Sequence, residues 1–401
     1  MPRKTARAVG LAARALTTLA GAALVGWSAI ADGHWAERHL LPAYCATNRA
    51  EWAFARGVAW IAAALGVAAI WKLAPALASR VERASLRGRA GALAGIAVAV
   101  AASLAVGEAI ARRTHDRVML GGRIPAAGER EAPMTRVDAR LGWSYLPGRT
   151  TWTRMGGRAV AYAIDLDGDR AASSAGRPDP ARSTILFAGE SIAFGYGLPW
   201  EETFPYLVGR DLGVQQVNLA VVGYGSDQAH LRVLDALPRF ARPLAVVTVF
   251  IPAQMRRNVE PWRPRLALGP GGALVPVPAS GGARLTRLLA ELPFRGEEGL
   301  AVTAAVLRAT AEAARARGAL PLFVVTNYGA ACLRQDGEPW IVDELFVRQG
   351  LPFVRVDLEG EDLLPEAFER HPGPRGARKI ARAVELALSQ RLGLRLLETA
   401  F

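Results

Sequence analysis

The sequence predicts an α/β domain built on a parallel sheet, preceded by a transmembrane helical region and a small β-rich segment. From residue 181 onward, apolar strand-like runs alternate with helical patterns, which is typical of a three-layer domain whose parallel sheet is covered on both faces. Before residue 112, three apolar stretches approach the ~20 residues needed to cross a membrane. We therefore expect a membrane region over 1–112, a linker over 113–133, a β-rich segment over 134–180 and the α/β domain over 181–401.

The membrane region is predicted from apolar stretches at 15–31, 58–78 and 90–111. They contain too few polar residues to give an amphipathic soluble helix its solvated face. The first stretch has an alternative interpretation as a cleaved signal peptide, because Ala29-Ile30-Ala31 resembles a small-x-small cleavage site after a basic segment.

Basic residues set the expected orientation of these helices. Four precede the first helix and four fill the loop between the second and third: Arg3, Lys4, Arg7 and Arg14, then Arg80, Arg83, Arg87 and Arg89. Positive residues favour the cytoplasmic side, so we predict a bacterial inner-membrane protein whose chain after Arg112 is extracytoplasmic. Cys45 and Cys332 would both face that oxidising side, where they either form a disulfide or are two unrelated small apolar residues.

Charge and motif content exclude several classes of function. The net charge of +13 comes almost entirely from arginine, without a basic stripe interleaved with aromatic residues, so we expect no nucleic-acid partner. None of the five histidines has a second ligand at metal-like spacing, and we expect no metal. No Gly-rich phosphate loop precedes a Lys-Ser/Thr pair, so we expect no nucleotide cofactor and predict no cofactor of any kind.

Within the domain, the expected elements follow in order. The β-rich segment alternates with period two over 141–147 and 159–166. The core strands are expected near 184–188, 214–220, 244–251, 319–326 and 353–357, and the helices near 202–212, 226–240, 299–318 and 374–393. An insertion at 262–278 indicates a β-hairpin. It is either a substrate-binding flap with Trp262 beside it or a hairpin packed on the β-rich segment.

The turn Gly189-Glu190-Ser191 is a candidate nucleophile site, because it ends an apolar strand and starts a helix. A serine there exposes its hydroxyl beside backbone N–H groups, although many such turns serve only as helix caps. Late in the chain, His371 lies on a loop with Glu369 two positions earlier. This order, with a serine early in the chain and an acidic residue and a histidine late, is typical of a nucleophile, a general base and the acid that orients it.

These residues resemble the SGNH, or GDSL-like, hydrolase superfamily from about residue 141 to the C-terminus. The family's first block, usually Gly-Asp-Ser, corresponds to Gly189-Glu190-Ser191, the second to 218–225 with Gly223, and the last to Glu369-Arg370-His371. The resemblance implies a nucleophilic Ser191, His371 as general base, Glu369 as its orienting partner, and an oxyanion hole formed by the N–H groups of Ser191 and Gly223.

The third block departs from the family pattern. Ala253 stands where the family has an asparagine that donates to the oxyanion, and Gln254 stands where it has an aspartate. Losing one oxyanion donor typically costs on the order of 10² to 10³ in rate. Gln254 and Asn258 are the side chains that we consider as substitutes.

The resemblance implies an extracytoplasmic serine ester hydrolase that acts on an acylated envelope component, either a glycan or a lipid. A first alternative is an O-acyltransferase that modifies an envelope polysaccharide, with a membrane acyltransferase as its partner. A second alternative, motivated by Ala253, is a non-catalytic binding or assembly protein that keeps the fold.

Overall fold

The computed structural model describes residues 3–31, 49–83, 134–155, 158–279, 296–326, 337–364 and 371–393. The chain divides into two compact units, Met1–Ile124 with Gly282–Pro293, and Pro125–Gly281 with Phe294–Phe401. The third apolar stretch (90–111), the expected linker (113–133), Cys45, Cys332 and Glu369 lie outside the described residues.

The first unit contains two long apolar helical runs. One is α1 (Arg3–Ile30), and the other is α3 (Arg49–Ala68), which continues through a π-helical turn, η1 (Ala69–Leu73), into α4 (Ala74–Arg83). Within the described residues, the stretches Gly10–Ile30 and Arg56–Arg80 are long and apolar enough to cross a membrane. They coincide with the first two predicted spans, and the first also lies where a signal sequence would lie.

Glycine lets α1 and α3 approach closely. A Cβ on Gly21 would lie 2.7 Å from the Gly66 carbonyl oxygen, and one on Gly66 would lie 2.6 Å from the Gly21 carbonyl oxygen. Large apolar side chains such as Leu19 and Trp60 are exposed instead. Small residues at the contact and apolar residues outside are typical of helices that pack together within lipid.

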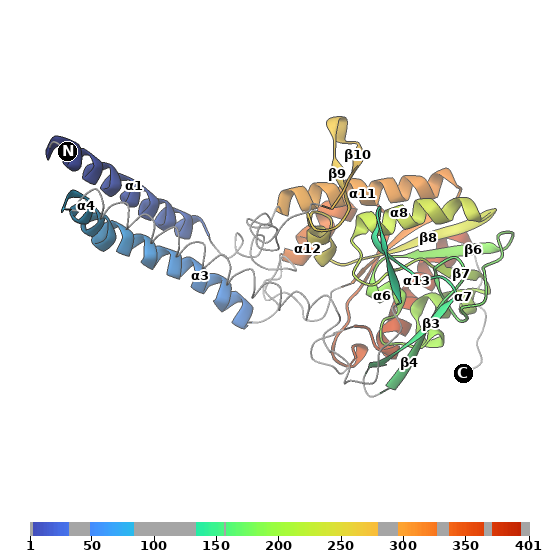
Figure 1. Ribbon diagram of the computed structural model, residues 1–401. Helices are drawn as coiled ribbons and strands as arrows, with labels where there is room; N and C mark the ends of the chain where they lie inside the picture. The colour runs from blue at the N-terminus through green and yellow to red at the C-terminus, as the bar shows by residue number, and fades with distance from the viewer. Residues whose placement is uncertain are drawn as a thin grey trace. The chain divides into compact units, whose positions relative to one another are not determined.

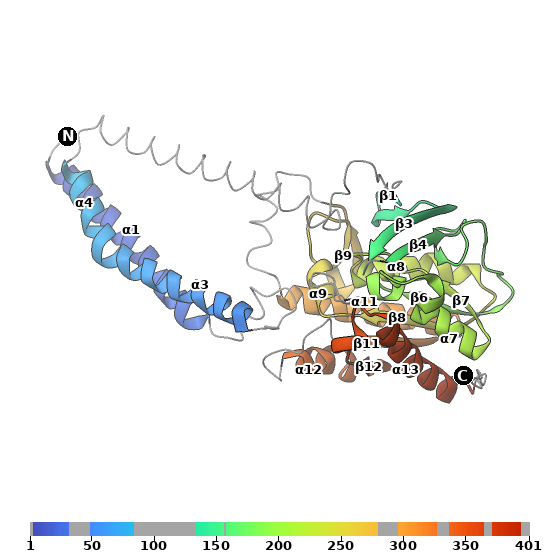
Figure 2. The same ribbon diagram turned by 90° about the horizontal axis from the view of Figure 1, so that it is seen from below.

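The second unit is built on one eight-stranded sheet. Its order across the sheet is β12-β11-β8-β6-β7-β5-β4-β3, and Figure 2 shows β12 and β3 on opposite sides of this unit, with β8 and β6 between them. The strands in this order are β12 (Phe353–Val356), β11 (Leu320–Thr326), β8 (Arg242–Phe250), β6 (Ser183–Ala188), β7 (Gln215–Asn218), β5 (Arg170–Ala171), β4 (Arg158–Ile164) and β3 (Arg149–Met155). The first five are mutually parallel, and β5, β4 and β3 are added antiparallel.

Helices cover both faces of this sheet (Figure 1). They are α7 (Phe204–Leu212) and α13 (Pro374–Leu392) on one face, and α8 (Ser226–Ala236) and α11 (Gly296–Ala316) on the other. Along β6, Ile185 and Phe187 belong to the core on the α7 and α13 face, whereas Leu186 and Ala188 belong to the core on the α8 face. The period-two alternation places both sets in apolar cores. The predicted three-layer α/β domain is confirmed.

The expected β-rich segment is not a separate layer. Its strands β3, β4 and β5 extend the central sheet through the pairing of Arg170 in β5 with Asn218 in β7. Within this segment, β1 (Thr135–Asp138) and β2 (Gly142–Tyr145) form a separate two-stranded sheet. This pairing could not be predicted from the residue pattern, because β5 is only two residues long.

A helix that the sequence analysis did not predict follows β11. It comprises α12 (Gly337–Val342) and the π-helical turn η5 (Asp343–Val347). Phe346 of this turn packs edge-on against Phe250 and is tilted against Phe323, with ring centroids 5.4 and 5.6 Å apart. It therefore covers the β8–β11 side of the sheet.

The insertion forms the predicted hairpin, from β9 (Arg265–Leu268) and β10 (Leu274–Val277). It stands out from the helical face in Figure 1. Leu266 is buried with Val302 and Val306 of α11, so the hairpin packs on that helix, and Arg263 at its base lies against the Trp143 ring of β2.

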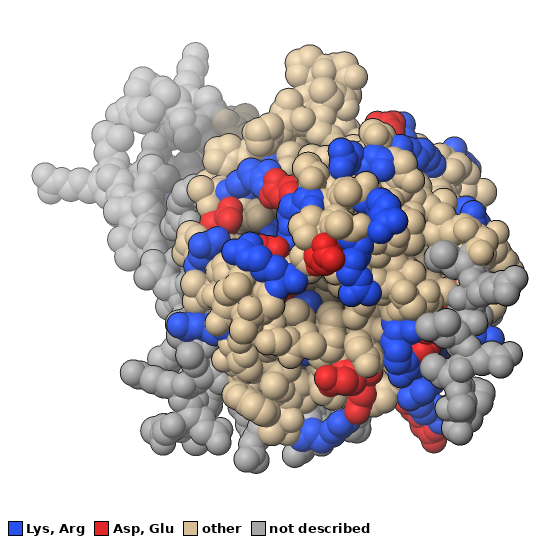
Figure 3. Space-filling model, turned by 90° about the vertical axis from the view of Figure 1, so that its right-hand side faces the viewer, with Lys and Arg blue, Asp and Glu red and all other residues tan. Residues whose placement is uncertain are grey.

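The charged surface is mixed. Figure 3 shows Lys and Arg scattered among Asp, Glu and uncharged side chains on one face, without a single continuous stripe. Acidic partners lie close to several of the arginines, as in the pairs Arg140–Asp235 and Arg158–Glu202.

Candidate active site

Ser191 lies at the point where the strand order reverses. After β6 the chain adds β7 on one side and then crosses to β8 on the other. Ligands in open parallel sheets bind beyond the carboxyl ends of the strands at such a point. Gly189 makes the turn there with φ of +140°, and a Cβ on it would lie 3.1 Å from Val249 Cβ. Ser191 then begins the short helix α6 (Ser191–Phe194).

The structure brings Ser191 and His371 together from 180 positions apart in the chain, with Ser191 Oγ 2.7 Å from His371 Nε2. Both side chains are buried, with exposed fractions of 5% and 7%. The His371 loop is held by its own backbone, because its carbonyl oxygen accepts a hydrogen bond of 2.8 Å from the Leu364 N–H. The Tyr196 ring contacts the imidazole, with centroids 5.0 Å apart. The 2.7 Å between Ser191 Oγ and His371 Nε2 is hydrogen-bonding distance for a nucleophile and its general base.

Glu190 occupies the space beside the nucleophile. Its buried carboxylate accepts hydrogen bonds from the N–H groups of Ser191 at 2.7 Å and Ile192 at 3.1 Å. The same oxygen that accepts from the Ser191 N–H, Oε2, also contacts Ser191 Oγ. In this structure the Ser191 N–H, expected to face an oxyanion, therefore already has an anionic acceptor.

The backbone of the second block is braced from β2. Trp143 Nε1 donates to the Val222 carbonyl oxygen at 3.2 Å, and Tyr145 Oη accepts from the Val222 N–H at 3.0 Å. The C=O and N–H of a trans peptide point in opposite directions, so the tryptophan bond fixes where the Gly223 N–H points. Among the described residues, none accepts a hydrogen bond from this N–H. Gly223 has φ of +84°, a conformation that favours glycine.

Arg263, at the base of the hairpin, holds the other side of the same glycine. Its Nη1 donates to the Gly223 carbonyl oxygen at 2.8 Å and to Gln228 Oε1 at 3.0 Å. The guanidinium also pairs with Glu260 at 2.7 Å and lies 5.1 Å from the centre of the Trp143 ring. Burial lowers the pKa of Arg263. Sequence reasoning missed Arg263, Trp143 and Tyr145, because no motif marks contacts made across 40 to 80 residues.

The third block contains the helix α9 (Ala253–Arg257). Gln254 Nε2 donates to the Val249 carbonyl oxygen at 3.3 Å, and its Oε1 accepts from Ser226 Oγ at 2.8 Å. Asn258 Nδ2 donates to Thr303 Oγ1 at 2.7 Å. Both amides are buried, and each already donates to a scaffold oxygen; that one of them replaces the asparagine donor stays a prediction.

An arginine on the same helix does lie near the serine. Arg257 Nη1 is 3.8 Å from Glu190 Oε2 and donates to the Tyr224 carbonyl oxygen at 3.0 Å. It thus connects α9 with the first and second blocks. Sequence reasoning did not single it out.

The loop after α6 rests on a buried arginine. Arg170 donates to the carbonyl oxygens of Ala161 and Leu198 at 3.1 and 3.4 Å, and its guanidinium lies 5.0 Å from the Tyr162 ring centre and 5.4 Å from that of Phe194. Burial lowers the pKa of Arg170 to about 10. This side chain connects β4 to the segment that follows Ser191.

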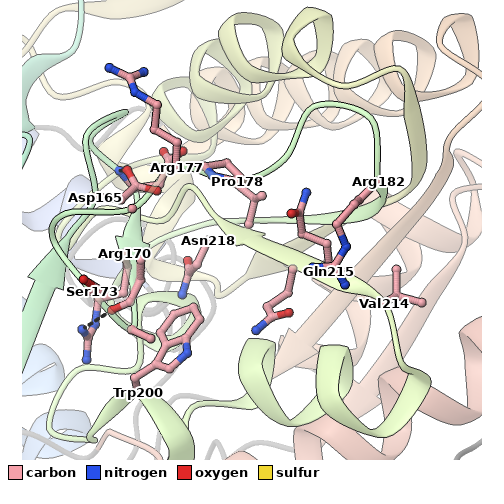
Figure 4. Close-up of a pocket in the computed structure, with 16 residues that line it drawn as sticks. Asp165, Arg170, Ser173, Arg177, Pro178, Arg182, Trp200, Val214, Gln215 and Asn218 are labelled. Carbon is pink, nitrogen blue, oxygen red and sulfur yellow. Dashed lines mark hydrogen bonds between the residues drawn. The ribbon is translucent and has the colours of Figure 1, made fainter.

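A cavity of about 290 Å³ lies elsewhere, between the β4–β5 loop and β7. Figure 4 shows Asp165 and Arg170 on one side of it, Gln215 and Arg182 on the other, and Asn218 between them. Ser191, Gly223 and His371 are not among its lining residues, so it is distinct from the candidate active site. Among the described residues, no group of three or more His, Cys, Asp or Glu side chains could hold a metal ion.

No protein-family model and no curated protein sequence matches the chain. Similar solved structures include a lipolytic protein of the G-D-S-L family from Desulfitobacterium hafniense, with 14% identity over 51% of this chain and 99% of that one, at a TM-score of 0.31. An acetyl xylan esterase from Butyrivibrio proteoclasticus has 10% identity, coverages of 54% and 66%, and a TM-score of 0.34. A salicylyl-acyltransferase from a tetracycline biosynthetic pathway has 15% identity, coverages of 55% and 59%, and a TM-score of 0.29. Likenesses at these scores do not define the activity of this chain.

Proposed function

We propose that the protein is a serine ester hydrolase of the SGNH type, acting on an acylated glycan or lipid of the cell envelope. The observation that carries the proposal is the 2.7 Å contact between Ser191 Oγ and His371 Nε2, two buried side chains at the switch point of a parallel sheet. A helix cap alone would not require a histidine brought from 180 residues away.

In the proposed mechanism, Ser191 Oγ attacks the acyl carbonyl carbon while His371 Nε2 takes the hydroxyl proton. The Gly223 N–H, fixed by the Trp143 bond to the Val222 carbonyl oxygen, donates to the resulting oxyanion. His371 then gives its proton to the leaving alkoxide, and an acyl-enzyme forms on Ser191. Water activated by His371 releases the acid, and Glu369 is proposed to orient the imidazole.

An O-acyltransferase would use the same site, with a sugar hydroxyl in place of water as the second acceptor. The two apolar helices support a membrane-anchored protein. We propose the inner membrane, with the catalytic unit on its outer side and a membrane acyltransferase as the partner in the transfer case. The absence of the asparagine at position 253, together with the Ser191 N–H bonded to Glu190, keeps a non-catalytic binding protein as the third candidate.

The test uses the full-length chain in detergent with p-nitrophenyl acetate as substrate. We expect acetate release by the wild type and by Ser173→Ala, which changes an exposed serine away from the site, but not by Ser191→Ala. Adding an envelope polysaccharide separates the first two candidates, because a transferase diverts acetyl groups from water to the glycan. Absence of turnover by a folded wild type would favour the non-catalytic protein.

A further inference from the structure

We infer that Arg257 supplies the side-chain oxyanion donor, in place of the asparagine that the third block lacks. The inference rests on the proposed function and deepens it by naming a catalytic residue. Its starting point is an oxygen that already sits beside the nucleophile, Oε2 of Glu190.

The Glu190 Oε2 atom has the neighbours that an oxyanion on Ser191 would have. It accepts the Ser191 N–H at 2.7 Å, contacts Ser191 Oγ, and lies 3.8 Å from Arg257 Nη1. In a tetrahedral intermediate, the negative oxygen is bonded to the carbon that Ser191 Oγ has attacked, so it too lies next to Oγ and needs N–H donors around it. The carboxylate oxygen therefore marks an anion-binding position in which Arg257 provides the positive charge.

The placement of Arg257 on α9 fits this role. Ala253 and Arg257 are four residues apart, at the two ends of α9, and residues at this spacing lie on the same face of a helix. Helical side chains lean toward the N-terminal turn, so the expected direction of the long Arg257 side chain is back toward Ala253. Alanine at 253 removes the short donor that the family uses, and it leaves this face open to a longer donor from one turn later.

The Arg257 guanidinium carries more N–H groups than its bond to Tyr224 uses. A guanidinium carries five N–H groups in a planar fork and stays charged, and the Tyr224 carbonyl oxygen takes one of them at 3.0 Å. That bond holds the side chain against the residue that follows Gly223. The Gly223 N–H and the Arg257 guanidinium thus belong to two segments joined by a hydrogen bond, the loop after β7 and the helix α9.

Glu190 then acts as an internal competitor for the position. A substrate carbonyl must displace Oε2 from the Ser191 N–H before the oxyanion can form there. Glu190→Asp shortens the arm by one methylene and keeps both the charge and a good helix-capping group. We expect this variant to raise kcat on p-nitrophenyl acetate, because the shorter carboxylate no longer fills the position.

The deciding experiment compares Arg257→Gln and Arg257→Lys with wild type in the full-length chain, using the neutral substrate p-nitrophenyl acetate. Arg256→Gln is the matched control, because this neighbouring arginine pairs with Glu260 at 3.9 Å, whereas Arg257 pairs with Glu190. We expect Arg257→Gln to lower kcat by on the order of 10² to 10³ with little change in KM. Arg257→Lys should recover part of the loss, and Arg256→Gln should match wild type.

Thermal unfolding of each variant separates a catalytic loss from a folding defect. A well-folded Arg257→Gln that keeps kcat within about threefold of wild type would overturn the assignment of Arg257 while leaving Ser191 catalysis intact. A folded wild type that neither hydrolyses p-nitrophenyl acetate nor forms an adduct of Ser191 with a fluorophosphonate would overturn the proposed function, and the assignment of Arg257 with it.

Discussion

The two segments that flank Ser191, the loop after β7 and the helix α9 after β8, would supply the proposed oxyanion site in different ways. The loop after β7 offers a backbone N–H, that of Gly223, and its neighbouring peptide is held by Trp143 and Tyr145 of β2. The helix after β8 would have to offer a side chain, and at position 253 that side chain is only a methyl group. A backbone donor survives most substitutions along its loop, whereas a side-chain donor is lost with a single residue.

The surroundings of the two loops differ correspondingly. Around Gly223, the Arg263, Trp143 and Tyr145 side chains all act on backbone groups. Around α9, the amides of Gln254 and Asn258 donate to the scaffold, and Arg257 lies 3.8 Å from Glu190. The Gly223 N–H is held by its neighbours, whereas the side-chain donor is missing at position 253. We expect this combination if the side-chain donor has moved along α9 from position 253 to position 257.

The largest expected effect comes from removing the proposed nucleophile, Ser191, or the proposed base, His371. Ser191→Ala and His371→Ala should each reduce p-nitrophenyl acetate turnover to background, and the double variant should be no worse than either single one, because the two groups act as a unit. Steady-state rates of the three proteins check this. Independent, multiplicative losses would mean that the 2.7 Å contact is not a working nucleophile and base pair.

The next effect sharpens the contrast between the loops. Ala253→Asn restores the family's donor, so it should raise kcat strongly in an Arg257→Gln background, by up to about 10² to 10³. In the wild type the gain should be much smaller, because Arg257 already donates. Equal gains in both backgrounds, measured as a double-mutant cycle, would show that the two side chains do not share one role.

A smaller effect tests the brace of the Gly223 loop. Trp143→Phe keeps an aromatic ring but loses the hydrogen bond to the Val222 carbonyl oxygen, which is worth about 1 kcal/mol. We expect a loss in kcat of at most about tenfold with little change in KM. Trp152→Phe is the control, because Trp152 is exposed on β3. Equal kcat values for the two variants would argue against the brace.

The smallest effect concerns Asp227, which connects the two loops. Its N–H donates to Asn258 Oδ1 at 3.3 Å, and its carboxylate accepts from the Leu266 N–H of the hairpin at 3.1 Å. Burial raises the pKa of Asp227 to about 6, above the ~3.9 of an unfolded chain. Since the folded state holds this proton more tightly, its contribution to stability is present below about pH 4 and is lost as the pH rises to about 6.

Asp227→Asn should therefore flatten the pH dependence of the unfolding free energy between about pH 4 and 6, as measured by denaturant titration. Asp235→Asn is the control, because this aspartate lies on the same helix but its side chain is 47% exposed. An unchanged slope in Asp227→Asn would mean that the Asp227 carboxyl is ionised throughout this range.

The core of the fold could be predicted from the sequence, but the tertiary contacts that connect the site residues could not. The five parallel strands are apolar runs separated by helical patterns, so periodicity and length define them. The two-residue strand β5 carries no such signal, although it joins β3 and β4 to the sheet. Ser191 and His371 were found from turn chemistry and from the resemblance. Arg257 was not, because an arginine on a helix normally indicates a solvated face until tertiary contacts are known.

The most direct test of the central claim is labelling of the full-length protein with a fluorophosphonate, read by intact mass and peptide mapping. An activated serine displaces fluoride and keeps the phosphonyl group. We predict one adduct on Ser191 in the wild type, in Arg256→Gln and in Ser173→Ala, and none in Ser191→Ala or His371→Ala. A folded wild type that takes up no label, or that takes it up equally without His371, would contradict an activated nucleophile at Ser191.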